Sequence, residues 1–245
     1  MSHKRTTTIK PLRLTRWLSQ LGYVETRREA ESFIYRHTIL VQGNPVTRGD
    51  VKVLPQDVTI NGEPMDSPRI VIMVHKPAGY VCSHEDAGLR VYDLLPERYR
   101  YRSGLVTVGR LDKDTTGLLL MTDDGDLVHR LTHPKKHIAK TYEVTLEKPL
   151  SGNEAAVFSS GTLMLDNEKT PLQPAMLEPT GTHSAHLILH EGRYHQVKRM
   201  FAATGNHVTQ LHRSAIGKLE LDTLAVGQWR LLSEEEEHDY FNTDV

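Results

Sequence analysis

The sequence GRLDKDTTGLLL, residues 109–120, decides how the central part of this chain folds. A short apolar segment at 106–108 precedes it and an apolar run at 118–122 follows, which predicts a tight polar turn between two strands. Gly109 and Gly117 bracket the turn, where the backbone needs unusual angles or a close approach to another segment. The stretch therefore predicts a strand–turn–strand unit that is fixed at both ends.

Two charged side chains, Arg110 and Asp112, lie within this turn. A carboxylate held between rigid apolar elements has the fixed geometry that a reactive group requires. An aspartate in a turn, however, more often only hydrogen-bonds the neighbouring backbone. The turn alone leaves both interpretations open.

Length and composition limit the class of protein. With 245 residues, 38% hydrophobic and 25% charged, the chain has room for one sizeable core and a small second domain. No apolar run approaches the ~20 residues that a membrane-spanning helix needs, and residues 1–10 lack the apolar segment of a signal peptide. The single cysteine, Cys82, excludes an internal disulfide. We therefore expect a cytoplasmic protein that does not enter a membrane.

Charge is unevenly distributed along the chain. Residues 1–60 contain ten Lys and Arg against five Asp and Glu, whereas residues 216–245 contain two against eight. A basic N-terminal part can attract phosphate groups while an acidic C-terminal tail stays in solvent. On charge alone, two ordinary solvated termini are an equally good interpretation.

The N-terminal region, residues 11–62, has the pattern of a small separate domain. Apolar side chains recur at i, i+3, i+4 and i+7 over residues 14–21, which predicts an amphipathic helix. Thr26 and Glu29 match a capping box that predicts a second helix. Three short strands are expected at 39–41, 51–53 and 58–60.

This region resembles the S4-type RNA-binding module. The segments TRREAE at 26–31 and VQG at 41–43 carry most of the likeness. It departs from the module at 36–38, where Arg-His-Thr stands in place of the usual Gly-Arg-Val. The resemblance implies contacts to RNA phosphates, which position RNA without reading its sequence. The basic residues expected to make them are Arg13, Arg16, Arg27 and Arg28.

The remainder of the chain is predicted to form a larger α+β domain. Residues 63–69, with two prolines, are expected to be a linker, and residues 233–245 an acidic tail. Between them, residues 70–232 mix strands and helices without a regular alternation, which favours a largely antiparallel sheet with flanking helices. A polar insertion is expected at 84–104.

Two further motifs favour a functional interpretation of the turn at 109–117. They are KTY at 140–142 and EGRYHQVKRM at 191–200. Together with residues 109–120, they closely resemble the signature motifs of RNA pseudouridine synthases, in the order of that family. His195 and the DDG sequence at 123–125 favour the branch that acts on small-subunit (16S) ribosomal RNA over the large-subunit branch. The segment HKPAGY at 75–80 resembles another family element, with His75 in place of the usual asparagine.

The resemblance implies a curved, mostly antiparallel catalytic sheet and specific roles for three residues. Asp112 matches the catalytic aspartate, and Lys198 matches the basic residue that pairs with it, where many relatives carry arginine. Tyr142 matches the tyrosine that lies against the target base. Further RNA contacts are expected from Arg110, Arg193, His195 and Arg199.

The reaction that the resemblance implies requires no cofactor and no metal, and the sequence contains no motif for either. His129, His133 and His137 are spaced four residues apart, as metal ligands can be. Pro134 interrupts a continuous helix there and no cysteine or acidic cluster accompanies them, so we do not expect a metal site.

The sequence therefore predicts an enzyme that isomerises one uridine of 16S ribosomal RNA. The expected substrate is a small-subunit assembly intermediate that carries ribosomal proteins, and the enzyme is expected to be a monomer. Two alternatives stay open: the same reaction on 23S ribosomal RNA, and a non-catalytic RNA-binding assembly factor. A metal hydrolase that uses the histidines is a third, less favoured reading.

Overall fold

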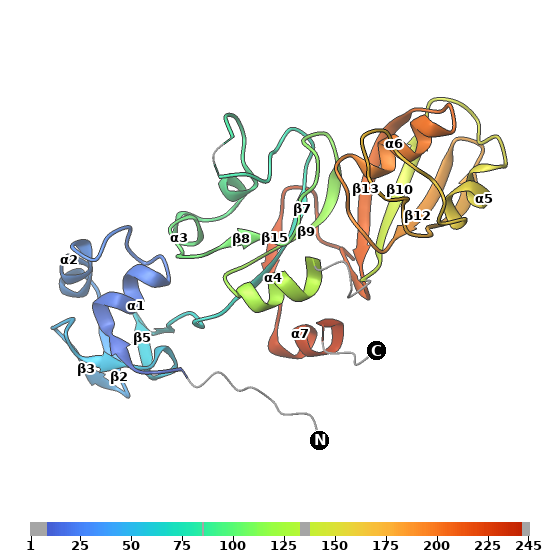
Figure 1. Ribbon diagram of the computed structural model, residues 1–245. Coiled ribbons are helices and arrows are strands. Elements are labelled where there is room, and N and C mark those ends of the chain that lie inside the picture. Colours follow the sequence, from blue (N-terminus) through green and yellow to red (C-terminus); the bar gives the residue numbers. More distant parts are fainter. Residues whose placement is uncertain (1–8, 85, 133–137, 242–245) are drawn as a thin grey trace, which may run out of the picture. The chain divides into compact units, whose positions relative to one another are not determined.

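The computed structural model describes residues 9–84, 86–132 and 138–241, and the chain divides into two compact units (Figure 1). The first unit combines Met1–Ile70 with Leu95–Leu105, and the second combines Val71–Leu94 with Val106–Val245. Within the described ranges, no helix is long and apolar enough to span a lipid bilayer.

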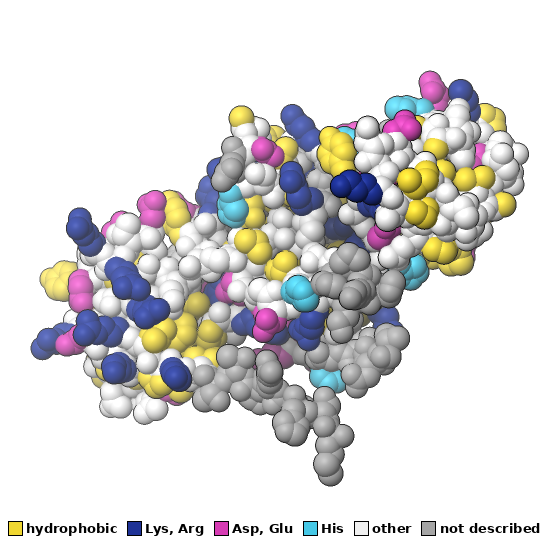
Figure 2. Space-filling model, viewed as in Figure 1, with side chains coloured by type: hydrophobic (Ala, Val, Ile, Leu, Met, Phe, Trp, Pro, Cys, Tyr) yellow, Lys and Arg dark blue, Asp and Glu magenta, His cyan; other side chains and the backbone are white. Residues whose placement is uncertain are grey.

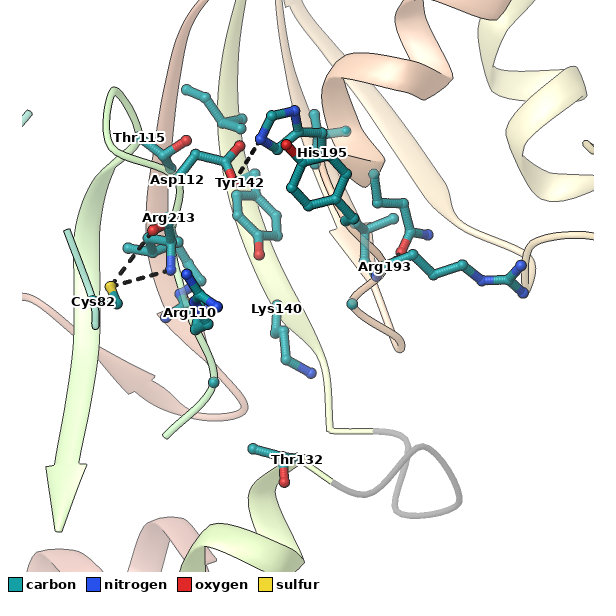
Figure 3. A pocket seen from close by; sticks show the side chains of 18 of the residues that line it. Cys82, Arg110, Asp112, Thr115, Thr132, Lys140, Tyr142, Arg193, His195 and Arg213 are labelled. Atoms are coloured by element: carbon teal, nitrogen blue, oxygen red, sulfur yellow. Dashed lines mark hydrogen bonds and ion pairs between the residues drawn. The ribbon is translucent and has the colours of Figure 1, made fainter. Parts of the chain in front are cut away.

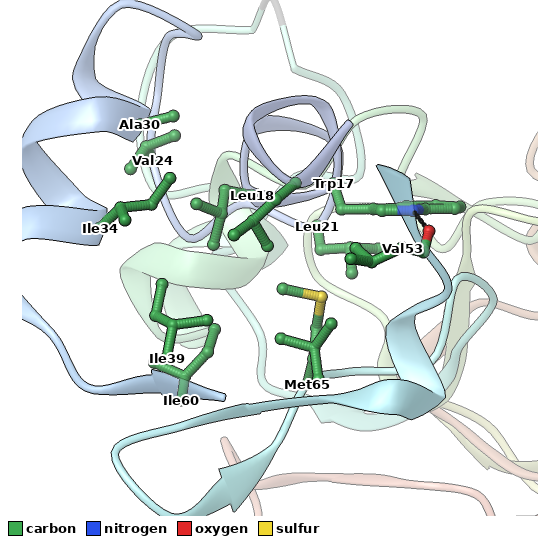
Figure 4. Packing of buried hydrophobic residues seen from close by; sticks show 12 residues of the cluster. Trp17, Leu18, Leu21, Val24, Ala30, Ile34, Ile39, Val53, Ile60 and Met65 are labelled. Carbon is green, nitrogen blue, oxygen red and sulfur yellow. Dashed lines mark hydrogen bonds between the residues drawn. The ribbon is translucent and has the colours of Figure 1, made fainter. Parts of the chain in front are cut away.

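In the first unit, two short helices cover small β-sheets. The predicted apolar stripe is buried in α1 (Leu14–Gln20), and the Trp17 indole donates a hydrogen bond to the Val53 carbonyl at 2.9 Å (Figure 4). The second helix is α2 (Glu29–Arg36). The strand order is β3 (Asn44–Pro45), β2 (Ile39–Val41), β5 (Val58–Ile60), β6 (Glu63–Pro64), with β1 (Leu12–Arg13) paired to β4 (Lys52–Val53) and a 3-10 turn η1 (Pro55–Asp57).

The predicted capping box at Thr26 does not form as expected. The Thr26 hydroxyl donates to the Glu29 carboxylate at 2.9 Å, and Glu29 is itself the first residue of α2. The two side chains therefore bond to each other instead of to the orphan backbone N–H groups of a helix end.

The linker predicted at residues 63–69 is instead part of the first unit. Residues 63–64 form β6, an edge strand, where a proline removes no needed hydrogen bond. Met65 is buried in the core, and the Asp66 carboxylate lies 3.3 Å from the Arg98 guanidinium. Two prolines in a short polar stretch therefore mark an edge strand here, and not a free connection.

The polar insertion predicted at 84–104 is split between the two units. Its second half contains α3 (Glu97–Arg100), with Tyr99 buried. Arg102, also buried, donates to the Ser67 carbonyl at 2.6 Å, and the Ser103 amide donates to the Gln20 carbonyl at 3.0 Å. The chain therefore enters the second unit at Val71, returns to the first unit for residues 95–105, and then re-enters the second unit.

The second unit is built on a nine-stranded sheet, with strands β9 and β13 parallel and the other paired strands antiparallel. This mixed sheet with flanking helices confirms the predicted α+β class. The main path is β11 (Met176–Gly181), β12 (Ser184–Leu189), β10 (Lys140–Leu146), β13 (Val208–Ile216), β9 (Thr116–Thr122), β7 (Val71–Lys76), β15 (Trp229–Leu231), with β8 (Val106–Thr107) on β9 and β14 (Leu219–Glu220) on β13.

The centre of this sheet is buried on both faces. Residues 71–74 of β7 and 118–121 of β9 have no exposed surface, which explains their continuous apolar sequences. Phe158 meets Phe201 edge to face at 5.2 Å between ring centres, which joins two of the helices. The helices are α4 (Gly125–Thr132), α5 (Glu154–Ser159) and α6 (Gln196–Ala203), with a 3-10 turn η2 (Val91–Leu94).

The predicted acidic tail is partly a helix, α7 (Glu234–Phe241). The Glu236 amide donates to the Ser233 hydroxyl at 3.1 Å, and the Ser233 amide donates to the Glu236 carboxylate at 2.8 Å. Arg230 forms an ion pair with Glu236 at 2.7 Å, and Phe241 packs on the core. A capping box and an apolar last turn therefore anchor this segment.

Candidate active site

The turn at 109–117 approaches a neighbouring strand very closely. Gly117 has φ +112° and lies beside Arg213 in the parallel pairing of β9 with β13. A Cβ atom at this position would lie 2.3 Å from the Arg213 carbonyl oxygen. Within the turn, the Thr115 amide donates to the Asp112 carbonyl at 3.1 Å. The C-terminal glycine of the motif is therefore required by close packing of two backbones.

A fully buried lysine, Lys76, supports the turn from β7. Its ammonium group donates to the carbonyl oxygens of Pro77 at 3.0 Å, Lys113 at 3.2 Å and Thr115 at 2.7 Å. Burial lowers the pKa of Lys76 to about 8, so the side chain is charged at neutral pH. Cys82, which is buried, contacts both the amide and the carbonyl of Leu111 at 3.5 Å (Figure 3).

Replacing this lysine should loosen the turn. We expect Lys76→Met to lower the free energy of unfolding by about 2–4 kcal/mol, because three buried carbonyl groups lose a charged donor. The measurement is urea denaturation, combined with a modification assay on the folded fraction. Unchanged stability and activity would show that Lys76 does not hold the turn.

Asp112 lies within ion-pair distance of two groups from the 191–200 motif. Its carboxylate is 3.3 Å from the Lys198 ammonium and 3.5 Å from His195 Nε2. Lys198 is on α6, more than eighty residues away in sequence, and also binds the Asp114 carboxylate at 2.6 Å. The hydrogen bond from Lys198 lowers the pKa of Asp114. Burial alone would lower the pKa of Lys198, but the carboxylates of Asp112 and Asp114 outweigh it and raise the pKa of Lys198. The ammonium group therefore stays protonated between two carboxylates.

Helix α6 begins at Gln196, in the middle of the 191–200 motif. His195 precedes it with left-handed backbone angles, φ 48° and ψ 32°, which non-glycine residues rarely adopt. Its ring stacks on that of Tyr194, with 3.8 Å between centres. This backbone turn places the imidazole beside Asp112 instead of along the helix.

Asp112, His195 and Tyr142 line one cavity of about 640 Å³ (Figure 3). Its size is within the ~300–1,000 Å³ typical of small-ligand pockets. Tyr142 is only 8% exposed and reaches the cavity from β10, as its alternation along the strand predicts. Arg110 also lines the cavity, where it is exposed. The structure thus brings the predicted aspartate, tyrosine and lysine together.

Arg193 and Arg199, predicted as RNA contacts, are instead occupied by protein acceptors. Arg193 binds Glu191 at 3.0 Å and Glu168 at 3.1 Å. Arg199 binds the same Glu168 at 2.9 Å, as well as the Asp166 carbonyl. Because most of their donors are used, both guanidinium groups brace the loop beside α6, which disfavours a direct contact with RNA.

Four other predicted RNA contacts belong to the first unit, which contains none of the three motifs that line the cavity. All four are exposed, and Figure 2 shows Lys and Arg side chains spread over the surface of that unit. They are Arg13, Arg16, Arg27 and Arg28.

Three site residues escaped sequence reasoning: Asp114, Lys140 and Arg213. Asp114 is only two residues from Asp112 and could have been suspected as a second partner of a lysine. Lys140 and Arg213 line the cavity from neighbouring strands, β10 and β13. No spacing in the sequence indicates that these strands are adjacent.

The histidine spacing considered for a metal falls largely outside the residues that the structure describes. His129 is on α4, whereas His133 and His137 are in the gap at 133–137. Among the described side chains, no group of three or more His, Cys, Asp or Glu is arranged to hold a metal. His75, the departure from the family motif, uses Nδ1 to bond the Leu224 carbonyl at 2.7 Å.

Comparison with known proteins finds relatives over most of the chain. A family model described as RNA pseudouridylate synthase matches residues 70–203. A "Ribosomal small subunit pseudouridine synthase A" from Yersinia pestis is 47% identical over 92% of this chain and 96% of its own length. Its Escherichia coli K12 counterpart is 45% identical over 92% and 98%.

A solved structure extends the similarity to three dimensions. It is the crystal structure of a pseudouridylate synthase, 38% identical, with a TM-score of 0.66 over 94% of this chain and 99% of that one. Sequence, family model and fold agree over most of the molecule. This chain belongs to the RNA pseudouridylate synthase family and is an enzyme of that class.

Proposed function

We propose that this enzyme isomerises a uridine of small-subunit ribosomal RNA to pseudouridine, with Asp112 as the catalytic carboxylate. The observation that carries the assignment is the position of Asp112, ion-paired to Lys198 and in the same cavity as Tyr142. The substrate assignment rests on relatives whose names specify the ribosomal small subunit. His195 within the 191–200 motif favours the same branch.

The reaction exchanges one glycosidic bond for another. The bond between ribose C1′ and uracil N1 breaks, the base rotates, and a bond forms between C1′ and C5. The C5 hydrogen leaves as a proton and N1 gains one, so the change needs no oxidant, reductant or energy source. A carboxylate can start it by attack on uracil C6, by attack on C1′, or by removing a proton at C2′.

Each neighbour of Asp112 has a distinct role in this proposal. Lys198 forms an ion pair with the carboxylate at 3.3 Å and thereby fixes its position at the cavity. Tyr142 offers its ring to a uracil that has been turned out of its helix. Arg110, exposed at the rim, holds the phosphate of that nucleotide or fills the space it leaves.

We further propose that the first unit is an S4-like module that binds RNA phosphates. Arg27 and Arg28 are exposed in the segment that carries the likeness. We expect the double variant Arg27→Ala/Arg28→Ala to weaken RNA binding about tenfold and to reduce the slope of log affinity against log salt by between one and two. Filter binding at several salt concentrations measures both; Lys218→Ala, an exposed charge in the second unit, is the control. Equal affinity and slope in all three proteins would contradict the assignment.

Tritium release from RNA labelled at uridine C5 tests reaction and substrate together. We expect release from 16S RNA, and the assay repeated with ribosomal proteins tests the proposed assembly intermediate. Release from 23S RNA alone would replace the substrate assignment, and mapping of the modified nucleotide would locate the uridine. An RNA-binding assembly factor would release no tritium from either RNA. The same proposal places the enzyme in the cytoplasm as a monomer.

A further inference from the structure

Arg213 is a buried cation with an unused donor in the wall of the cavity. The residue is 2% exposed, and its Nε donates to the Leu118 carbonyl at 2.8 Å. Its terminal nitrogen Nη2 is buried and has no hydrogen-bond partner among the described residues. A buried guanidinium nitrogen without an acceptor is costly, so the site favours a ligand that supplies one.

Lys140 is a second cation in the same wall. Its ammonium group donates to the Ile138 carbonyl at 3.1 Å. Over the described parts of the chain, no carboxylate forms an ion pair with Lys140 or Arg213, and the adjacent residues 133–137 contain no Asp or Glu. Burial and the neighbouring Arg213 lower the pKa of Lys140 to about 8. Two cations therefore lie in one wall, and neither is ion-paired with a carboxylate of the described residues.

Both cations lie beside Tyr142. Lys140 is two residues before Tyr142 on β10, so both side chains are on one face of the strand. Arg213 is the direct cross-strand partner of Tyr142 on β13. All three line the cavity that contains Asp112, as Figure 3 shows. A base that lies against the tyrosine ring has its edge next to these cations.

We propose that Lys140 and Arg213 form a subsite for the carbonyl oxygens of the target uracil and stabilise the negative charge that the base acquires during isomerisation. The inference rests on the proposed function. If Asp112 attacks C6, the electron pair of the C5–C6 double bond moves to O4. If instead the C1′–N1 bond breaks, its electron pair stays on N1 and is shared with O2 and O4. Each route therefore places negative charge on a carbonyl oxygen.

Arg213 is buried and Lys140 is half-buried, which assigns the pair to the base and not to the phosphate. The phosphodiester stays attached to the RNA strand and must remain near the rim, where the exposed Arg110 is available. A cation in a dry site acts more strongly on developing charge than one in water. Because that charge appears only as the reaction proceeds, the pair should affect the chemical step more than RNA binding.

Single-turnover kinetics on saturating small-subunit RNA test the proposal. We expect Lys140→Met to slow the chemical step about 10²–10³-fold and to change RNA affinity less than about threefold. Lys140→Arg, which keeps the charge, should recover the rate to within about tenfold. The control is Lys218→Met, which removes an exposed lysine outside the cavity. A Lys140→Met rate equal to that of the control would overturn the proposal.

The pH profile of kcat/KM provides a second readout. In the wild type we expect activity to fall above pH of about 8, as Lys140 loses its proton; in Lys140→Arg that fall should move to higher pH. Lys76, whose pKa is also about 8, is unchanged in the Lys140→Arg variant. An identical fall of kcat/KM in both proteins would therefore assign the fall to Lys76 and overturn the proposed role of Lys140. The other charged and titratable side chains that line the cavity with Lys140 are Cys82, Asp86, Arg110, Asp112, Lys113, Tyr142, His190, Glu191, Arg193, Tyr194, His195 and Arg213.

Unfolding does not account for such a fall. The lowered pKa values mean that the folded protein binds fewer protons at Lys76 and Lys140 than the unfolded chain does between pH of about 8 and 10.5. The contribution of these groups to the free energy of unfolding therefore rises with pH over that range. Thermal denaturation at each pH checks this point.

Binding of uridine and of UMP separates the base from the phosphate, and requires no turnover. If the pair contacts the base, Lys140→Met weakens both ligands by a similar factor. If it contacts the phosphate, only UMP is weakened and the base assignment is overturned. Wild type and Asp112→Asn are assayed in parallel on RNA: an inactive wild type contradicts the proposed function, while the two ligand titrations still decide the role of Lys140.

Discussion

Asp112→Asn should abolish pseudouridine formation, with a rate loss of at least about 10⁴-fold. Asparagine has almost the same shape, so the cavity and the turn persist. The amide, however, can neither attack the nucleotide nor accept a proton as a carboxylate does. Lys198 keeps its 2.6 Å ion pair with Asp114, so α6 stays in place. RNA affinity should therefore change less than about threefold while tritium release disappears.

Asp114→Asn is the matched control. It removes the same charge two residues away, from a side chain that is 72% exposed and outside the cavity lining. Lys198 would keep Asp112 as its partner at 3.3 Å. We expect a loss of less than about tenfold, because exposed ion pairs contribute little. Equal activity of Asp112→Asn and wild type would instead favour a different catalytic group.

Gly117→Ala should be the most damaging substitution of a small residue in the second unit. The added Cβ would lie 2.3 Å from the Arg213 carbonyl oxygen and 2.6 Å from its amide nitrogen, and a backbone cannot yield as a side chain can. The φ of +112° adds strain for any L side chain. We expect a loss of about 3–5 kcal/mol in the free energy of unfolding, measured in urea, together with loss of activity.

Gly109→Ala tests the other end of the same turn. Gly109 has φ +71°, but the nearest atom to an added Cβ is the Thr132 methyl carbon at 4.0 Å. Only the cost of the left-handed conformation remains, about 1 kcal/mol. If both alanine variants lost the same stability, the close approach at Gly117 would not be the cause.

Much of the catalytic turn could be predicted because its information is local. Two bracketing glycines, a polar turn and two apolar strands are written in consecutive residues, and the structure forms β8 and β9 there. The alternation around Tyr142 is equally local, because every second side chain from Tyr142 to Leu146 of β10 is buried. Local patterns of this kind predict secondary structure and the buried face of each element well.

The missed site residues depend on strand order, which is not local. Lys140 and Arg213 meet because β10 and β13 pair across more than seventy residues. Lys140 begins the KTY motif and Arg213 lies in a distant segment, but neither segment indicates that the two residues are neighbours until that pairing is known. Lys76 is similar: its three acceptors become visible only when the turn is folded back onto β7.

The error at the C-terminus had a different cause. Ser233 and Glu236 form a Ser-x-x-Glu capping box, a pattern typical of the start of a helix. The prediction of a solvated tail rested on the four consecutive glutamates alone. At the first turn of a helix, however, negative charges are favourable because they face the positive end of the helix dipole.

The path of the chain through its two units limits how the protein can be divided. A shortened protein that begins at Val71 would keep residues 95–105 but lose the helices and strands that bury Tyr99 and Arg102. Their apolar and cationic groups would then meet water, directly upstream of β8 and the catalytic turn. Exchange of the N-terminal module between relatives would therefore require two separate gene segments to be transplanted together.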